Sequence, residues 1–169
     1  MSSVVSNVVY GGIDGTVTTF AVMAGALGSG LTGFIVIILG MANVFADGFS
    51  MGVSSYESVV DESEDPLMKA ITTFLAFITI GMIPVLGFYM VIDLDYDTKF
   101  ITTIISSLLT LFMIGLFKGL ASQSDSIVKS GLKTMTLGGI AGTIAYLVAI
   151  SLSNLESKNK VVKLESKNM

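Results

Sequence analysis

Long apolar runs, each near the length of a membrane span, occupy most of this chain. A helix of about 20 apolar residues crosses the hydrocarbon core of a bilayer. Hydrophobic residues make up 52% of the sequence and charged residues only 13%, about half the charged fraction of a typical soluble domain. We therefore predict an all-α, polytopic membrane protein with a transmembrane domain at 1–153, whose five spanning helices lie at about 4–27, 31–56, 70–92, 100–120 and 134–152.

The first of these segments is the least apolar, because it carries Asp14 among several glycines and threonines. Glycine and threonine allow close contact between membrane helices, so we interpret 4–27 as a membrane helix with Asp14 facing protein or water. A loop followed by a shorter helix from Val17 is the alternative. The connection 28–30 is short and predicts a tight hairpin between the first two helices.

Several classes of function are excluded by what the sequence lacks. It has no cysteine and no histidine, which removes disulfides, thiolate metal sites and histidine acid–base chemistry. A net charge of −4 without a long basic run argues against a nucleic-acid partner. No phosphate-binding loop of the Walker type is present, and no motif indicates an enzyme. The start of the chain, MSSVVSN, has no basic region, so we expect no cleaved signal peptide.

The lysines between the predicted helices indicate an orientation. With the N-terminus in the cytosol, the inner connections hold Lys69, Lys118, Lys129 and Lys133, and the outer ones hold only Lys99. This distribution agrees with the positive-inside rule. The lysines of the tail favour the opposite orientation, and we give the connections more weight.

A stripe of polar side chains runs along the second predicted helix. Asn43, Asp47 and Met51 follow one another at intervals of four residues, which places them on one side of a helix. A carboxylate within an apolar helix costs about 2.5–3.5 kcal/mol on insertion scales, so Asp14 and Asp47 are candidates for a functional site. The alternatives are hydrogen-bonded structural aspartates, an asparagine that joins two helices, and a methionine that only packs.

The two aspartates suggest a chemistry if they face one cavity. A divalent cation binds the deprotonated carboxylates and releases their protons, so metal ions and protons compete for the same oxygens. A site that opens alternately to each side would then exchange metal for protons. The thioether of Met51 favours first-row ions such as Fe²⁺ over Mg²⁺ or Ca²⁺.

The connection 57–69 and the tail 154–169 are the polar parts of the chain. We expect the second helix to continue beyond the membrane, with Glu57 and Asp61 on the face of an acidic extension. That face is either an ordinary solvated helix end or an entrance that concentrates cations. The tail repeats LESKN twice, and we expect it to be disordered or frayed.

Two runs of residues resemble motifs of a known family. The run DGTVTTF from Asp14 to Phe20, followed by Gly25, is similar to the first-helix motif of the vacuolar iron transporter family. The run ANVFADGFSMGVSSY from Ala42 to Tyr56 is similar to its second-helix motif. The resemblance implies a homodimer of five-helix protomers that exports Fe²⁺, commonly also Mn²⁺, from the cytosol in exchange for protons. It also implies that Asp14 and Met51 line the path.

The chain departs from the family pattern at two places. Plant-type members have a glutamate where this chain has Asn43, and we hypothesise that Asp47 supplies the missing charge. Plant-type and parasite-type members also insert a cytoplasmic metal-binding domain between the second and third helices. Here residues 57–69 alone occupy that place, which makes the chain a short form.

The leading interpretation is therefore a transition-metal/proton antiporter that binds no permanent cofactor. Its partners are Fe²⁺ or Mn²⁺, protons and the lipid bilayer. The expected metal-site residues are Asp14, Asp47 and Met51, with Asn43 in support and Glu57 and Asp61 at the entrance. A plasma-membrane location is expected in a microbial host and a vacuolar one in a plant or fungus. The alternatives are a non-transporting scaffold or metal sensor, and a passive cation channel.

Overall fold

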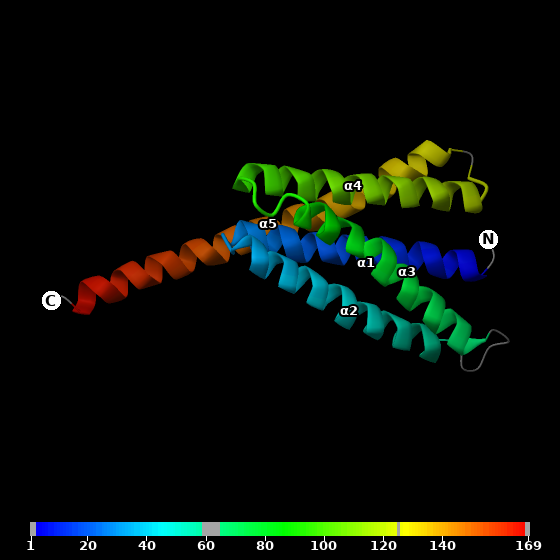
Figure 1. Ribbon diagram of the computed structural model, residues 1–169, viewed down its shortest axis with the longest axis horizontal. Coiled ribbons are helices and arrows are strands. Elements are labelled where there is room, and N and C mark those ends of the chain that lie inside the picture. The colour runs from blue at the N-terminus through cyan, green and yellow to red at the C-terminus, as the bar shows by residue number, and fades with distance from the viewer. Residues whose placement is uncertain (1–2, 59–64, 125, 168–169) are drawn as a thin grey trace.

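Five helices joined by short connections make up the computed structural model, which describes residues 3–58, 65–124 and 126–167 (Figure 1). The helices are α1 (Ser3–Gly28), α2 (Gly33–Glu57), α3 (Pro66–Tyr89), α4 (Tyr96–Ala121) and α5 (Ile127–Lys167). The described residues contain no strand, and the prediction of an all-α fold is confirmed.

The connection between α2 and α3 is shorter than expected. We predicted that the second helix continues with Glu57 and Asp61 on one face, but α2 ends at Glu57. Asp65 instead forms the N-cap of α3, because its Oδ1 accepts the backbone N–H groups of Leu67 at 3.0 Å and Met68 at 3.3 Å. Pro66 follows at the first helical position, which suits its fixed φ angle. Asp61 lies outside the described residues.

The C-terminal tail also differs from the prediction. We expected disorder or fraying from residue 154, but α5 continues as a helix to Lys167. Figure 1 shows this last part of α5 projecting beyond the other helices. At 1.5 Å per residue, the 41 residues of α5 exceed the roughly 20 that span a bilayer, so part of the helix extends outside.

A Schellman motif closes α1 and turns the chain into α2. Gly30 has a φ of +71°, a backbone conformation that glycine adopts without strain. The N–H of Gly30 donates to the carbonyl of Leu27, and the N–H of Leu31 donates to the carbonyl of Ala26. The predicted tight hairpin is thereby confirmed, and it makes α1 and α2 antiparallel neighbours.

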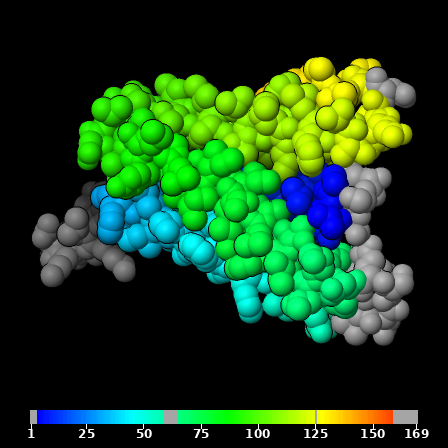
Figure 2. Space-filling model, turned by 45° about the vertical axis from the view of Figure 1, so that its right-hand side comes forward, coloured from blue at the N-terminus to red at the C-terminus, as the bar shows by residue number. Residues whose placement is uncertain are grey.

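The centre of the bundle is α1, which contacts α2, α3, α4 and α5. The outer helices contact one another in the order α2, α3, α4, α5, and in the described part of the chain α2 makes no contact with α5. On the face seen in Figure 2, α3 and α4 cover α1, whose dark blue atoms are visible only near its N-terminal end. One side of α1, between α2 and α5, is therefore left without a covering helix, and we call it the open side.

Four helices are long and apolar enough to cross a membrane: α2, α3, α4 and, in α5, residues Ile127–Lys158. Among the described helices α1 does not meet that criterion, although we predicted it as a fifth span. The central position of α1 explains why it is rich in glycine and threonine, because these small residues pack against the neighbouring helices.

Glycines set the close approach of α3 to the first two helices. Gly48 and Gly52 of α2 face Phe77 and Phe74 of α3, so α2 presents a surface of small residues to α3. On α1, Gly15 meets Gly81 of α3 backbone to backbone: a Cβ atom at Gly81 would lie 2.9 Å from the Gly15 carbonyl oxygen. The residue beside Gly15 is Asp14, so this contact fixes the height of Asp14 in the bundle.

Aromatic side chains hold the opposite end of α1. The hydroxyl of Tyr96, at the start of α4, donates to the carbonyl of Leu27 at 3.0 Å. The ring of Tyr96 stacks on Phe100, which in turn packs against Tyr146 of α5. These contacts connect α4 and α5 to the end of α1 that leads into the hairpin.

The start of α4 gives a testable pH dependence. Asp95 caps the helix, and the backbone N–H of Thr98 at 2.9 Å, with its hydroxyl at 2.8 Å, lowers the pKa of the carboxyl below its usual range. A lowered pKa in the folded state adds stability above the unfolded-state pKa of about 4, and this contribution is lost as the pH falls through the folded-state value. Asp95→Asn should therefore melt at a lower temperature than the parent protein at pH 7.

The difference in melting temperature should shrink as the pH falls from about 4 through the lowered pKa of Asp95, where the folded parent takes up a proton. Asp93→Asn, an exposed substitution just before the same cap, is the matched control. A difference between parent and Asp95→Asn that stays constant across this pH range contradicts the assignment.

Candidate metal site

Asp14 of α1 and Asp47 of α2 lie near each other in the hairpin, and their side chains interact electrostatically. Because the two helices run antiparallel from the turn at Gly30, residues in the middle of α1 lie level with residues in the middle of α2. Both carboxylates are half-buried, and they are close enough for their charges to repel each other. The structure thus brings together the two acidic residues that the sequence singled out in different helices.

The amide of Asn43 lies one helical turn from Asp47 toward the start of α2. Its Nδ2 donates to the hydroxyl oxygens of Thr18, at 3.3 Å, and Thr19, at 3.5 Å, both on α1. Thr19 is fully buried, and Thr18 is partly exposed. Asn43 therefore joins the two helices and also belongs to the polar surface near the aspartates.

A groove of about 530 Å³ follows this polar surface on the open side of α1. The side chains that line it and carry oxygen are Thr18, Asn43, Asp47 and Ser50; Ala21, Val22 and Ala46 complete the lining. A second groove of about 600 Å³ continues along α1 toward the hairpin turn, between α2 and α5. Carboxylate, amide and hydroxyl oxygens together form a donor set that suits a divalent cation.

The other predicted residues do not line this groove, and Asp14 is one of them: it lies near Asp47, one helical turn before Thr18. Met51 is half-buried one turn beyond Asp47 on α2 and does not line the groove. Glu57 is exposed at the last residue of α2, and Asp61 is outside the described residues. No group of three or more carboxylates able to hold a metal ion occurs within the described residues. A single chain therefore offers two acidic ligands at the site.

Three residues at the site were missed by the sequence interpretation: Thr18, Thr19 and Ser50. Thr18 follows Asp14 by four residues, and Ser50 follows Asp47 by three, so helical spacing alone places each beside an aspartate. Thr19 carries no such signal, because only the pairing of α1 with α2 brings it to Asn43.

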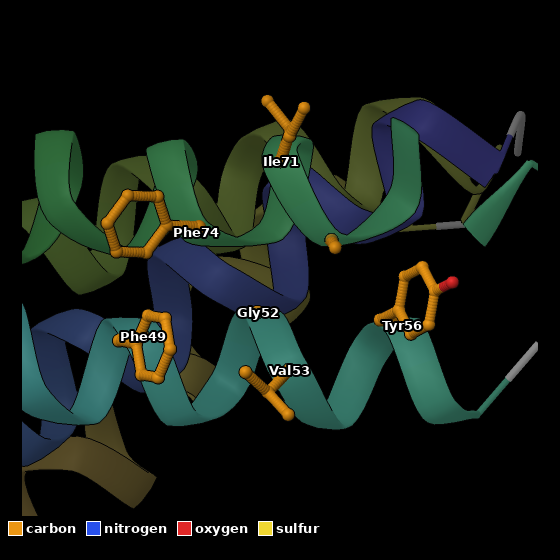
Figure 3. A pocket seen from close by; sticks show the side chains of 7 residues that line it. Phe49, Gly52, Val53, Tyr56, Ile71 and Phe74 are labelled. Atoms are coloured by element: carbon orange, nitrogen blue, oxygen red, sulfur yellow. The ribbon is translucent and has the colours of Figure 1, made fainter. Parts of the chain in front are cut away.

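A third groove, between the end of α2 and the start of α3, is apolar. Phe49, Val53 and Tyr56 of α2 and Ile71 and Phe74 of α3 surround it, above a floor at Gly52 (Figure 3). Almost none of its surface is polar, so it offers a cation no ligands. The polar groove on the open side of α1 is thus the candidate ion site.

Comparison with known proteins identifies relatives over most of the chain. A sequence model of the VIT family matches residues 5–65 and 60–150. A protein named vacuolar iron transporter from Plasmodium falciparum (isolate 3D7) is 27% identical over 224 aligned residues, which cover 87% of this chain and 81% of the relative. A protein of the same name from Toxoplasma gondii (strain ATCC 50861 / VEG) is 24% identical over 94% of this chain and 77% of the relative.

The form of these matches agrees with a short connection between α2 and α3. The two matched segments meet at residues 60–65, between α2 and α3. The 224 aligned positions exceed the 169 residues of the chain, so the relative carries additional residues that this chain lacks. With a family match from residue 5 to residue 150, this chain belongs to the VIT family as a short form.

Proposed function

We propose that this protein carries Fe²⁺, with Mn²⁺ as a second substrate, out of the cytosol in exchange for protons. The observation that carries the proposal is the electrostatic interaction of Asp14 with Asp47, which lines a groove together with the oxygen-bearing side chains of Thr18, Asn43 and Ser50. The relatives named vacuolar iron transporters support iron as the substrate and a vacuolar-type membrane as the location.

The exchange follows from the chemistry of the two carboxylates. A divalent cation binds them in their deprotonated form, and a cation that leaves allows protons to return. Metal and protons therefore occupy the same oxygens in turn. Met51, one turn beyond Asp47, offers a thioether to an ion that moves along α2, which favours Fe²⁺ over harder ions.

A homodimer completes this proposal. The open side of α1 carries both grooves and the partly exposed Asp47, and among the described helices α1 is the one that is not apolar enough by itself to span a membrane. A carboxylate turned toward lipid is costly, so a second copy that covers the open side would keep Asp14 and Asp47 away from hydrocarbon. In that arrangement α1 acts as a fifth membrane span between protein surfaces.

The connections between helices give the orientation. One end of the bundle holds the start of α1, the end of α2, the start of α3, the end of α4 and the start of α5 (Figure 1). Lys69, Lys118, Lys129 and Lys133 belong to that end, and Lys99 belongs to the other. Their distribution supports a cytosolic N-terminus, and with it entry of the metal ion from the end that carries Glu57.

Flux into proteoliposomes with an acidic interior tests the function. We expect Fe²⁺ to enter liposomes that contain the protein, and not the protein-free liposomes used as the control. A pH-sensitive dye should record proton efflux at the same time. Mn²⁺ should compete for uptake more strongly than Mg²⁺ at the same concentration. Fe²⁺ binding without flux would instead indicate a sensor or scaffold. Flux that does not depend on the proton gradient would indicate a passive channel.

A further inference from the structure

The two ends of the Asn43 amide have different chemistry. The NH₂ group only donates hydrogen bonds, and the carbonyl oxygen only accepts them. A cation binds the oxygen and is repelled by the NH₂ group, so the orientation of the amide decides whether Asn43 helps or opposes binding. In this structure the NH₂ group is turned toward α1, where Thr18 and Thr19 accept its hydrogen bonds.

Because the threonines engage the NH₂ group, Oδ1 is the atom that Asn43 can offer to the groove it lines. That oxygen lies one helical turn from the carboxylate of Asp47 on the same face of α2. Ser50 contributes a hydroxyl to the same groove. The donor set on this side of the site therefore depends on how α1 holds an amide that belongs to α2.

We infer that Thr18 and Thr19 are positioning residues, which hold the Asn43 amide with its oxygen toward the transported cation. The inference rests on the proposed function and adds two residues of α1 that set the affinity of the groove for its ion. Thr19 is fully buried and accepts from the amide at 3.5 Å, and Thr18, partly exposed, accepts from it at 3.3 Å and lines the groove. Without the two hydroxyls the amide rotates freely and presents either end.

The test replaces both threonines by valine, which has the same shape and no hydroxyl. For Thr18→Val combined with Thr19→Val, we expect the KM for Mn²⁺ to rise about five- to tenfold, the effect of losing two weak hydrogen bonds. The maximal flux should stay within about twofold of the parent protein, because the carboxylates remain. Serine at both positions keeps the hydroxyls and should restore the parent KM.

Thr16→Val is the matched control. Thr16 is a fully buried threonine of the same helix, but its hydroxyl donates to the carbonyl of Gly12 in its own helix at 2.8 Å. It should leave the KM for Mn²⁺ unchanged. In an Asn43→Ala background the paired valine substitutions should have no additional effect on the KM, because the threonines act through the amide.

Three results would overturn the inference: an unchanged KM, a KM change of the same size in the Asn43→Ala background, or a loss of protein stability alone. Titration of the purified protein with Mn²⁺ in detergent separates failure of this inference from failure of the proposed function. A parent protein that binds but does not carry Mn²⁺ refutes transport, and the comparison of Mn²⁺ affinities still decides the role of the threonines. A parent protein that neither binds nor carries Mn²⁺ overturns both proposals.

Discussion

Asp14→Asn and Asp47→Asn are each expected to reduce Fe²⁺ flux at least about 100-fold. A unit charge about 4 Å from another is worth about 4 kcal/mol at an effective dielectric constant of 20, and each 1.4 kcal/mol is a factor of ten in affinity. The amide keeps the size of the carboxylate but removes the charge that binds the cation and the proton that is exchanged. The measurement is Fe²⁺ uptake into proteoliposomes with an acidic interior.

The controls make this result specific to the paired aspartates. Asp97→Asn removes an exposed carboxylate at the other end of the bundle and should leave flux unchanged. The double variant of Asp14 and Asp47 should transport no worse than either single variant, since the two groups act as one unit. Flux within about threefold of the parent protein in either single variant would contradict the assignment of the site.

Gly81→Ala is expected to destabilise the fold by about 1–3 kcal/mol, the usual cost of inserting atoms into a packed interior. The new Cβ would lie 2.9 Å from the carbonyl oxygen and 3.2 Å from the Cα atom of Gly15, and backbone atoms cannot turn aside as a flexible side chain does. Separation of α1 from α3 would also displace Asp14, so flux should fall together with stability. The free energy of unfolding can be measured by titration with SDS in mixed micelles.

Gly139→Ala is the matched control for this substitution. A Cβ at Gly139 meets only a flexible leucine side chain, the Cδ2 of Leu108 at 3.5 Å. The same change should therefore be neutral or stabilising by about 0.5–1 kcal/mol, because alanine loses less conformational freedom than glycine in a helix. Equal destabilisation by the two substitutions would show that the contact of α1 with α3 does not determine the cost.

The candidate site was predictable where its signal lies within one helix. Asp47 stands out because a carboxylate interrupts an apolar run, and Asn43 follows from a spacing of four residues. Thr19 could not be predicted from such a pattern, because its partner Asn43 is 24 residues away in sequence. The role of Met51 stays a prediction, since the groove ends at Ser50 and Asp47.

The ends of the helices, like the candidate site, could be predicted only in part from the sequence. The third helix was predicted from about residue 70, but α3 begins at Pro66, because the carboxylate of Asp65 caps the helix there rather than extending an acidic face of α2. The polar composition of the last residues suggested disorder, and yet α5 continues without a break into its projecting end (Figure 1). Backbone hydrogen bonds within a helix do not require an apolar surface, and hydropathy therefore marks membrane spans better than helix ends.

The number of helices, the hairpin of α1 and α2, and the two acidic groups in apolar surroundings could all be predicted from the residue pattern alone. These properties depend on neighbours within a few turns of one helix, and so periodicity and hydropathy reveal them. Only the packing of the helices places α1 at the centre with one side open, brings Asp14 near Asp47, and lets threonines of α1 hold the Asn43 amide beside the groove that Asp47 lines. That arrangement depends on the backbone contact of Gly15 with Gly81 and on the absence of contact between α2 and α5 in the described chain. Both involve residues of different helices, so the pattern within a single helix cannot reveal them.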